Sequence, residues 1–211
     1  MKRDYFNTFE ENDFRVCADM EFDYKHKNML IPLEAWFDTD KKFGINAGND
    51  DNVWVNVSVE YNPAIGDIIM SYEINDENGS QSREYIMTAE ERSMVAQYIE
   101  KMCIENHEMT CMEFYITEYI ETCDCEIDLE CRQEGNVCRV YNTNDGAILY
   151  QEDMGGNLSK HIGHKIELAN YGDSECYSIE CMDCNEVLFS SDAERIRLQD
   201  IEDNDGQEMH M

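Results

Sequence analysis

The chain has 211 residues, of which 47 are Asp or Glu and 16 are Lys or Arg, so its formal net charge at pH 7 is −31. Negative charge on this scale disfavours direct binding to nucleic acids or to anionic membranes, because both recruit Lys and Arg side chains. It favours a basic protein as the partner, and the hydrophobic content of 42% is sufficient to build a core.

The ten cysteines are expected to be thiols or metal ligands rather than disulfides. The basic residues Lys2 and Arg3 are followed by Glu10, Glu11 and Asp13, where a signal peptide needs an apolar stretch. The sequence has no run of 18 or more apolar residues that would span a membrane. We therefore expect a cytoplasmic protein, a compartment in which thiols stay reduced.

Alternation of apolar and polar residues predicts an antiparallel β-meander in the first part of the chain. Residues 25–28 are expected to form the turn of its first hairpin, and Pro32 indicates that the next strand lies at a sheet edge. The predicted strands cover residues 14–24, 31–37, 53–59, 68–74 and 83–87.

Two capping boxes mark the expected starts of two helices. Thr88 and Glu91 form the first box, and Thr110 and Glu113 form the second, each followed by apolar residues at helical spacing. We expect both helices to pack on the apolar face of the meander.

The composition divides the chain into four parts. Residues 1–122 are expected to form an α+β domain with the β-meander and two packed helices, and residues 123–136, rich in Cys, Asp and Glu, a linker. Residues 137–200 are expected to form a small β-rich domain able to bind zinc, and residues 201–211 an acidic tail. In the small domain, strands are predicted at residues 137–141, 148–150, 165–171, 176–180 and 187–189, with a short helix near residues 157–161.

Two histidines and two cysteines have a spacing typical of a structural zinc site. If residues 172–175 form a hairpin turn, Ile166 lies opposite Cys181 and His164 lies beside the cysteines. Thiolates and imidazoles suit tetrahedral zinc, and four protein ligands leave no open position for a catalytic water. The candidate metal ligands are His161, His164, Cys181 and Cys184.

The same residues also fit an arrangement without metal. In it, His161 caps a short helix, His164 is a surface or half-buried histidine, and the cysteines are reduced and partly buried. Histidines before cysteines are also the reverse of the common zinc-finger order. A second zinc site is a further alternative, although a Cys-x-Cys pair holds a metal less well than Cys-x-x-Cys, and its candidate ligands are Cys123, Cys125, Cys131 and Cys138.

The sequence contains no nucleophile motif, phosphate-binding loop or dinucleotide-binding glycine pattern, so we do not expect an enzyme. Carboxylates three or four residues apart on a helix lie about 5–6 Å apart, and such a row can imitate phosphates. We therefore expect a partner-binding face on the second helix, with a merely solvated face as the alternative. The residues of this face are Glu113, Glu118 and Glu121.

A family resemblance is carried by residues 14–20, 33–38, 53–57, 164–168 and 179–188. These segments resemble an uncharacterised group of acidic proteins from phages and conjugative elements of gut Firmicutes. The resemblance covers most of the chain and implies no known activity or catalytic residue. It implies a mobile-element setting, in which small acidic proteins often disarm host restriction or CRISPR nucleases, some by imitating DNA.

The predicted function is therefore a non-enzymatic antirestriction or anti-CRISPR inhibitor of a mobile genetic element. It would mimic nucleic acid and bind a basic defence nuclease, without contacting nucleic acid or membrane itself. Two alternatives stay open. The first is a protein-binding adaptor with a structural zinc knuckle, whose acidity serves only solubility, and the second is a metal-dependent enzyme, which needs an open coordination position.

Overall fold

The computed structural model describes residues 14–16, 20–35, 54–76, 79–171 and 177–191. The chain forms two compact units, one of Met1–Asn62 with Gly66–Glu105 and one of Pro63–Ile65 with Asn106–Met211. Each unit contains an antiparallel sheet and an α-helix, so the predicted α+β fold class is confirmed. The predicted acidic tail lies outside the described residues.

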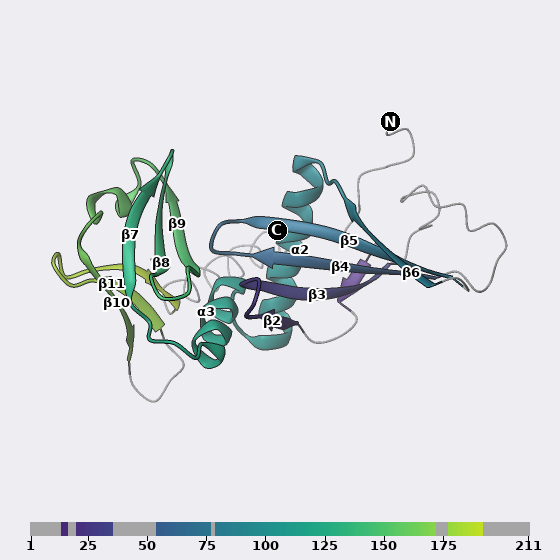
Figure 1. Cartoon of the computed structure of the whole chain (residues 1–211), viewed down its shortest axis with the longest axis horizontal. Coiled ribbons are helices and arrows are strands. Elements are labelled where there is room, and N and C mark those ends of the chain that lie inside the picture. The colour runs from purple at the N-terminus through teal and green to yellow at the C-terminus, as the bar shows by residue number, and fades with distance from the viewer. Residues whose placement is uncertain (1–13, 17–19, 36–53, 77–78, 172–176, 192–211) are drawn as a thin grey trace, which may run out of the picture. The chain divides into compact units, whose positions relative to one another are not determined.

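The sheet of the first unit is an antiparallel meander, drawn in purple to blue in Figure 1. Its strand order is β1-β3-β4-β5-β6, and β2 also pairs with β3. The strand predicted for residues 14–24 is two short strands, and the last strand begins at Gly79, before the predicted start. The strands are β1 (Phe14–Val16), β2 (Glu21–Asp23), β3 (Asn28–Ala35), β4 (Trp54–Asn62), β5 (Asp67–Asp76) and β6 (Gly79–Tyr85).

Pro32 does not mark a sheet edge, because β3 has β4 on one side and β1 and β2 on the other. The pairing with β2 extends to Leu30, and the pairing with β1 begins at Leu33. Among the described residues, Pro32 therefore pairs only with Ser58 of β4. Proline has no N–H to donate, so this interruption of the ladder accommodates it inside a sheet.

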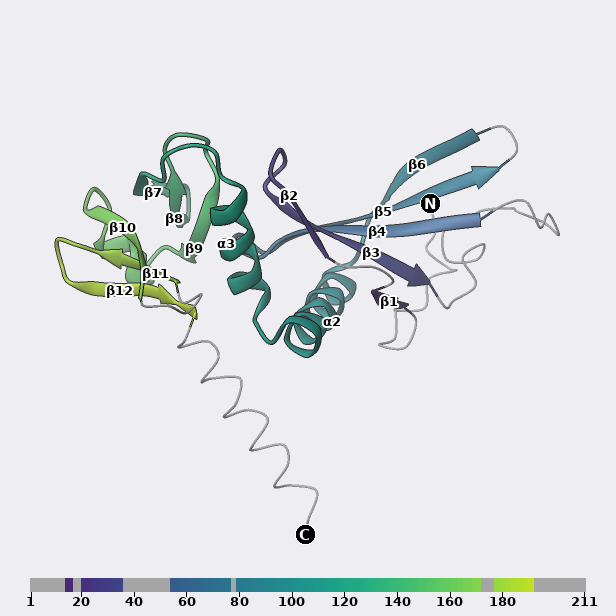
Figure 2. The same ribbon diagram turned by 90° about the horizontal axis from the view of Figure 1, so that it is seen from below.

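The core of the first unit lies between the sheet and α2 (Ala89–His107), which runs along one face of the sheet in Figure 2. Alternate strand residues point to this face and bury apolar surface against the helix. The best-buried residues are Met29, Ile31, Val59 and Met70 of the sheet and Val95, Ile99 and Cys103 of the helix. The described part of this unit places no helix over the opposite face of the sheet.

Both predicted capping boxes are confirmed. Thr88 N–H donates to Oε2 of Glu91 at 2.7 Å, and Glu91 N–H donates to Oγ1 of Thr88 at 3.2 Å. The same reciprocal pair joins Thr110 and Glu113 at 2.9 and 3.1 Å. Tyr85 O–H also donates to Glu91 at 2.9 Å, which connects the end of β6 to the start of α2.

The second unit is built on a six-stranded antiparallel sheet with the order β12-β11-β10-β7-β8-β9. Strands occur at all five predicted places, and the predicted short helix is the 3-10 helix η2. The elements are α3 (Cys111–Thr122), β7 (Leu129–Glu134), β8 (Val137–Asn142), β9 (Ile148–Asp153), η2 (Asn157–Lys160), β10 (Lys165–Asn170), β11 (Tyr177–Cys181) and β12 (Glu186–Ser190).

The prediction that residues 123–136 form a linker is wrong for Leu129–Glu134, which form strand β7. This strand pairs with both β8 and β10 and so joins the two halves of the sheet. Leu129 and Cys131 are buried, while Glu130 between them is partly exposed. The buried thiol of Cys131 acts as a small apolar side chain. The strand was missed because the prediction relied on large apolar residues, which are scarce in this segment.

Helix α3 groups with the second unit, and the first unit ends at Glu105 rather than at the predicted residue 122. Tyr115 O–H donates to the carbonyl oxygen of Ile148 at 3.0 Å, and Tyr119 O–H donates to Oδ1 of Asp145 at 3.0 Å. Both tyrosine rings are fully buried. These hydrogen bonds attach α3 to β9 and to the turn before it. The apolar stripe of the helix predicted a buried face but did not indicate which sheet this face would contact.

Replacing Glu113 with Ala should lower the free energy of unfolding by about 1–2 kcal/mol, because its buried carboxylate accepts the N–H of Thr110. Denaturation with urea, followed by circular dichroism, measures this change. Glu121→Ala is the matched control on the exposed side of the same helix and should change stability by less than about 0.5 kcal/mol. Equal stabilities of the two variants would contradict the capping role.

Candidate metal centre

The four predicted metal ligands converge beside the paired strands β10 and β11. The structure pairs Ile166 with Cys181, the register predicted from the sequence. The turn before β10, which carries both histidines, therefore meets the turn between β11 and β12, where the cysteines lie. One donor atom from each ligand lies within 4.8 Å of the other three, and the ligands are His161, His164, Cys181 and Cys184.

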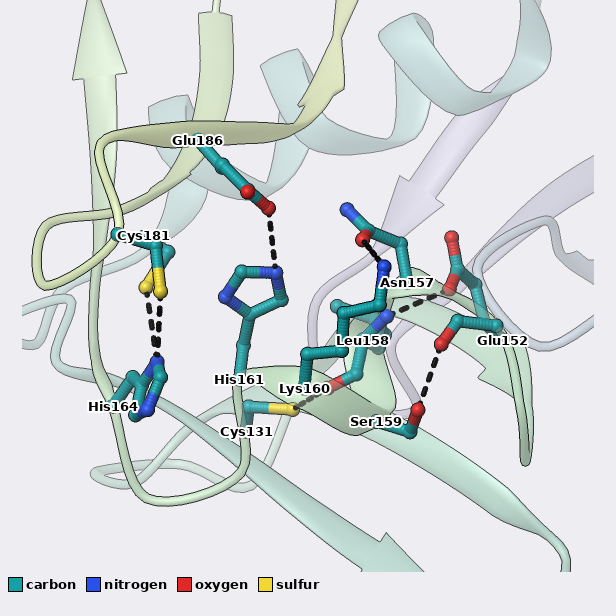
Figure 3. A network of polar contacts seen from close by, with 12 residues as sticks. Cys131, Glu152, Asn157, Leu158, Ser159, Lys160, His161, His164, Cys181 and Glu186 are labelled. Atoms are coloured by element: carbon teal, nitrogen blue, oxygen red, sulfur yellow. Dashed lines mark hydrogen bonds and ion pairs between the residues drawn. The ribbon is translucent and has the colours of Figure 1, made fainter.

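The two cysteines are held in a tight turn. The N–H of Asn185 donates to the carbonyl oxygen of Cys181 at 2.8 Å. Asn185 adopts a left-handed backbone with a φ of 61°, which asparagine tolerates better than most residues. In this turn both sulfur atoms face Nδ1 of His164, at 3.5 Å for Cys181 and 3.2 Å for Cys184 (Figure 3).

His161 is the deeply buried member of the group, with 1% of its surface exposed. Its backbone N–H donates to Leu158 and ends η2, as the alternative without metal expected. Neither ring nitrogen forms a hydrogen bond among the described residues. Nε2 lies 3.1 Å from Oε2 of Glu186, close enough for an ion pair but without hydrogen-bond alignment, and Figure 3 shows the other nitrogen directed toward the sulfur atoms.

The buried ring nitrogens of His161, which lack hydrogen bonds within the described part of the chain, favour a metal site over a histidine that only packs in the core. A buried polar group without a hydrogen bond costs about 1–3 kcal/mol, and a metal ion on the ring nitrogen would remove this cost. The carboxylate of Glu186 lies 3.1 Å from the other ring nitrogen, Nε2, the position where metal-bound histidines usually have a hydrogen-bond acceptor. No sequence pattern pointed to Glu186, since one more acidic residue in this chain carries little information.

Two thiols and two imidazoles form a donor set that binds divalent metals in tetrahedral geometry. These four residues can therefore hold a metal ion. The protein surroundings raise the pKa of Cys184, first through desolvation, then through its contact with Cys181 and the negative charges of Glu186 and Asp183. The same carboxylates attract a cation to the site.

The predicted second cysteine cluster is only partly assembled. Cys131 and Cys138 are buried away from it, with Sγ of Cys131 3.5 Å from the carbonyl oxygen of Leu158. Burial, followed by the nearby Cys138, raises the pKa of Cys131 to about 11, as expected for a packed thiol. Asp145 instead joins Cys123 and Cys125. No sequence pattern pointed to Asp145 among so many acidic residues.

The predicted partner-binding row on α3 does not form one accessible face. Glu113 is 3% exposed, and its carboxylate is occupied by the capping box. Glu118 is half-buried, and its pKa is raised by desolvation and by the charge of Glu121. Of the three residues only Glu121 is exposed, so the row cannot imitate a line of phosphates.

Comparisons with protein-family models, with curated proteins and with solved structures found no match to this chain. The resemblance to acidic mobile-element proteins therefore stays a prediction. Within the described residues, no helix has the length and apolar character that crossing a membrane requires.

Replacing Glu186 with Gln should weaken the binding of Co²⁺ by about 10-fold or more without changing the number of ions bound, because acceptors behind metal-bound histidines tune affinity to this extent. Titration followed by the absorption of thiolate-bound Co²⁺ measures both quantities. Glu180→Gln on the same hairpin is the matched control and should leave the affinity unchanged. Equal affinities of the two variants would remove Glu186 from the centre.

Proposed function

We propose that this chain is a non-enzymatic inhibitor that binds a basic, nucleic-acid-binding protein and blocks its binding surface. The observation that carries the proposal is the acidic face on the side of the first sheet away from α2. Register and alternation assign to this face a set of carboxylates and, among the described side chains of β2 to β6, no Lys or Arg. The carboxylates are Glu21, Glu60, Glu73 and Glu84.

Within the described part of β2 to β6 no cationic side chain on this face offsets its charge, and Arg15 of β1 pairs in register with Glu34 of β3. Glu60 accepts a hydrogen bond from an amide side chain and Glu73 from a hydroxyl, both neutral donors. A groove of about 420 Å³ runs beside Glu73, and Ser58 and Ser71 in its lining have hydroxyls 3.0 Å apart. Carboxylates and hydroxyls together offer acceptors to the Arg and Lys side chains of a partner.

The geometry of a sheet suits this role better than the helical row that the sequence predicted. By register, Glu73 and Glu84 are diagonal neighbours on β5 and β6, whereas Leu30 of β3 lies between Glu21 and Glu60. The carboxylates therefore form a sparse two-dimensional array with other outward residues between them. An array of this kind offers negative charge to a surface that otherwise binds phosphates. The net charge of −31 would add long-range steering toward such a surface.

The narrower proposal is that the partner is a restriction or CRISPR nuclease and that the inhibitor serves a mobile element. It draws its support from the family resemblance described above and from the acidic face. A reduced, cytoplasmic setting belongs to this proposal, and none of the eight described cysteines forms a disulfide.

Zinc in a structural role is the metal that we propose for the four-residue centre. Two sulfur and two nitrogen donors suit tetrahedral zinc, and all four positions would be filled by protein. Such an ion would tie the turn before β10 to the β11–β12 turn. A filled coordination sphere leaves no place for a catalytic water, which argues against the enzyme alternative at this centre.

A second candidate function is the adaptor with a zinc knuckle. Exposed apolar side chains cluster in sequence around the metal ligands, with Ile162 40%, Met182 45% and Val187 56% exposed. Apolar side chains exposed in this way would support a partner interface that is insensitive to salt. Salt dependence therefore separates the adaptor from the inhibitor, whose binding should weaken steeply as ionic strength rises.

Zinc should raise the free energy of unfolding of the wild-type chain by about 2.7 kcal/mol when free zinc is 100-fold above its Kd. Cys184→Ser should lose most of this gain, because it removes a thiolate ligand from an exposed position without opening the core. Denaturation with and without zinc measures the gain. Met182→Ser in the same turn is the control and should keep it, whereas an equal gain in both variants would argue against the site.

Neutralising the acidic face with Glu60→Gln, Glu73→Gln and Glu84→Gln should weaken partner binding by about 10-fold, since a charge pair at a solvated surface contributes up to about 1 kcal/mol. The partner is first captured from a bacterial lysate at low salt and identified by mass spectrometry. Its affinity for wild type and variant is then measured at rising salt and in the presence of DNA. The inhibitor proposal expects release by salt and by DNA.

The control for this experiment carries Glu105→Gln, Glu121→Gln and Asp153→Asn, which change the net charge by the same amount at exposed positions elsewhere. This variant should bind nearly as well as wild type. Equal losses in the two variants would assign binding to net charge rather than to the acidic face. Binding that resists both salt and DNA would favour the adaptor instead.

A further inference from the structure

The turn after α3 carries a second group of metal-ligating side chains, separate from the four-residue centre. Sγ of Cys123 lies 3.4 Å from Sγ of Cys125. A carboxylate oxygen of Asp145, from the turn between β8 and β9, lies within 4.8 Å of both sulfur atoms. All three side chains are half-buried, so they are enclosed by protein and still accessible to an ion.

Two fully buried side chains hold this group in position. Tyr119 O–H and Ala147 N–H both donate to Oδ1 of Asp145, at 3.0 and 3.1 Å. Nδ2 of Asn142 donates to the Tyr119 oxygen at 2.7 Å and lies 3.6 Å from Sγ of Cys125. Hydrogen bonds behind the ligating atoms orient the ligands in metal sites, and this group already has them.

The local electrostatics favour a cation. Cys123 is the C-cap of α3, where its N–H donates to the carbonyl oxygen of Tyr119 at 2.9 Å. The C-terminal end of a helix carries partial negative charge and attracts cations. Asp124 and Glu126 add two exposed carboxylates, and the sequence has no Lys or Arg from residue 119 to residue 131.

We propose that Cys123, Cys125 and Asp145 bind a thiophilic divalent cation of the Zn²⁺ and Cd²⁺ class. In a tetrahedral site with metal–sulfur bonds of about 2.3 Å, two thiolates lie roughly 3.8 Å apart, close to the 3.4 Å observed. Cys131 and Cys138 are buried elsewhere and cannot complete the site as the sequence suggested. Three protein ligands therefore leave one coordination position for water or a small ligand.

The open position makes this three-residue site chemically different from the four-residue centre. Its cation should exchange more readily and should be the first that a chelator removes. A thiol or an anion from solution can take the fourth position, which a centre with four protein ligands does not allow. The proposal does not rest on the proposed function, because the site lies within the second unit and needs no partner.

Native mass spectrometry of the full chain, reduced and stripped of metal, tests the site with Cd²⁺ as the probe. We expect wild type to bind one more Cd²⁺ than the double variant Cys123→Ser, Cys125→Ser. Cd²⁺ should also slow the alkylation of both cysteines in wild type, because metal-bound thiolates react poorly. Equal numbers of bound ions, or alkylation that Cd²⁺ does not slow, would overturn the proposal.

A variant that keeps the local hydrogen bonds tests whether a loss of Cd²⁺ binding results from the missing ligand or from loss of folding. Asp145→Asn retains an oxygen that accepts hydrogen bonds from Tyr119 and Ala147, but it removes the charge of the ligand. It should therefore lower the affinity for the additional Cd²⁺ ion by at least about 10-fold. Asp128→Asn is the matched control, because Asp128 accepts a hydrogen bond from Thr143 in the same turn region. It should change the affinity by less than about twofold. Equal affinities of the two variants would also overturn the proposal.

Discussion

The antiparallel pairing of β10 with β11 is the constraint on which the four-residue centre depends. Ile166 and Ile179 are buried on the core side of these strands, so the hydrophobic pattern selects a single register. A slip of β11 by one residue would turn Ile179, and Cys181 with it, to the other face of the sheet. Because the core holds this register, it brings the histidine turn and the cysteine turn together, and an ion bound there would join the two turns.

Sequence reasoning could reach this centre because each step followed a local rule. Counting back from an expected turn at residues 172–175 placed Ile166 opposite Cys181, and the observed pairing agrees although the turn itself lies outside the described residues. The capping boxes were predictable for the same reason, since four consecutive residues determine their geometry. The orientation of His161 was not predictable, because its burial and its approach to Glu186 of β12 depend on tertiary packing rather than on its neighbours in sequence.

The missed features share one cause, which is that residue type alone does not reveal environment. Cys131 was assigned to a linker and to a second zinc site, but its buried thiol packs inside β7. Glu113 was expected both to cap α3 and to face a partner, and one carboxylate cannot do both when the cap buries it. Asp145 was hidden by the abundance of acidic residues. In a chain with 47 acidic residues, burial and hydrogen bonding identify the carboxylates with a structural role, which composition alone cannot do.

The metal sites also bear on the charge that dominates the sequence. Zinc bound by two thiolates and two neutral imidazoles is electrically neutral as a group, so filling the four-residue centre would leave the net charge of −31 unchanged. Metal would thus stabilise the second unit by joining two turns, not by relieving repulsion. Some carboxylates already serve the fold, as Glu91 does at the start of α2. On the outer face of the first sheet, Glu60 and Glu73 accept hydrogen bonds from neutral side chains, and a basic protein would relieve the repulsion among the carboxylates there.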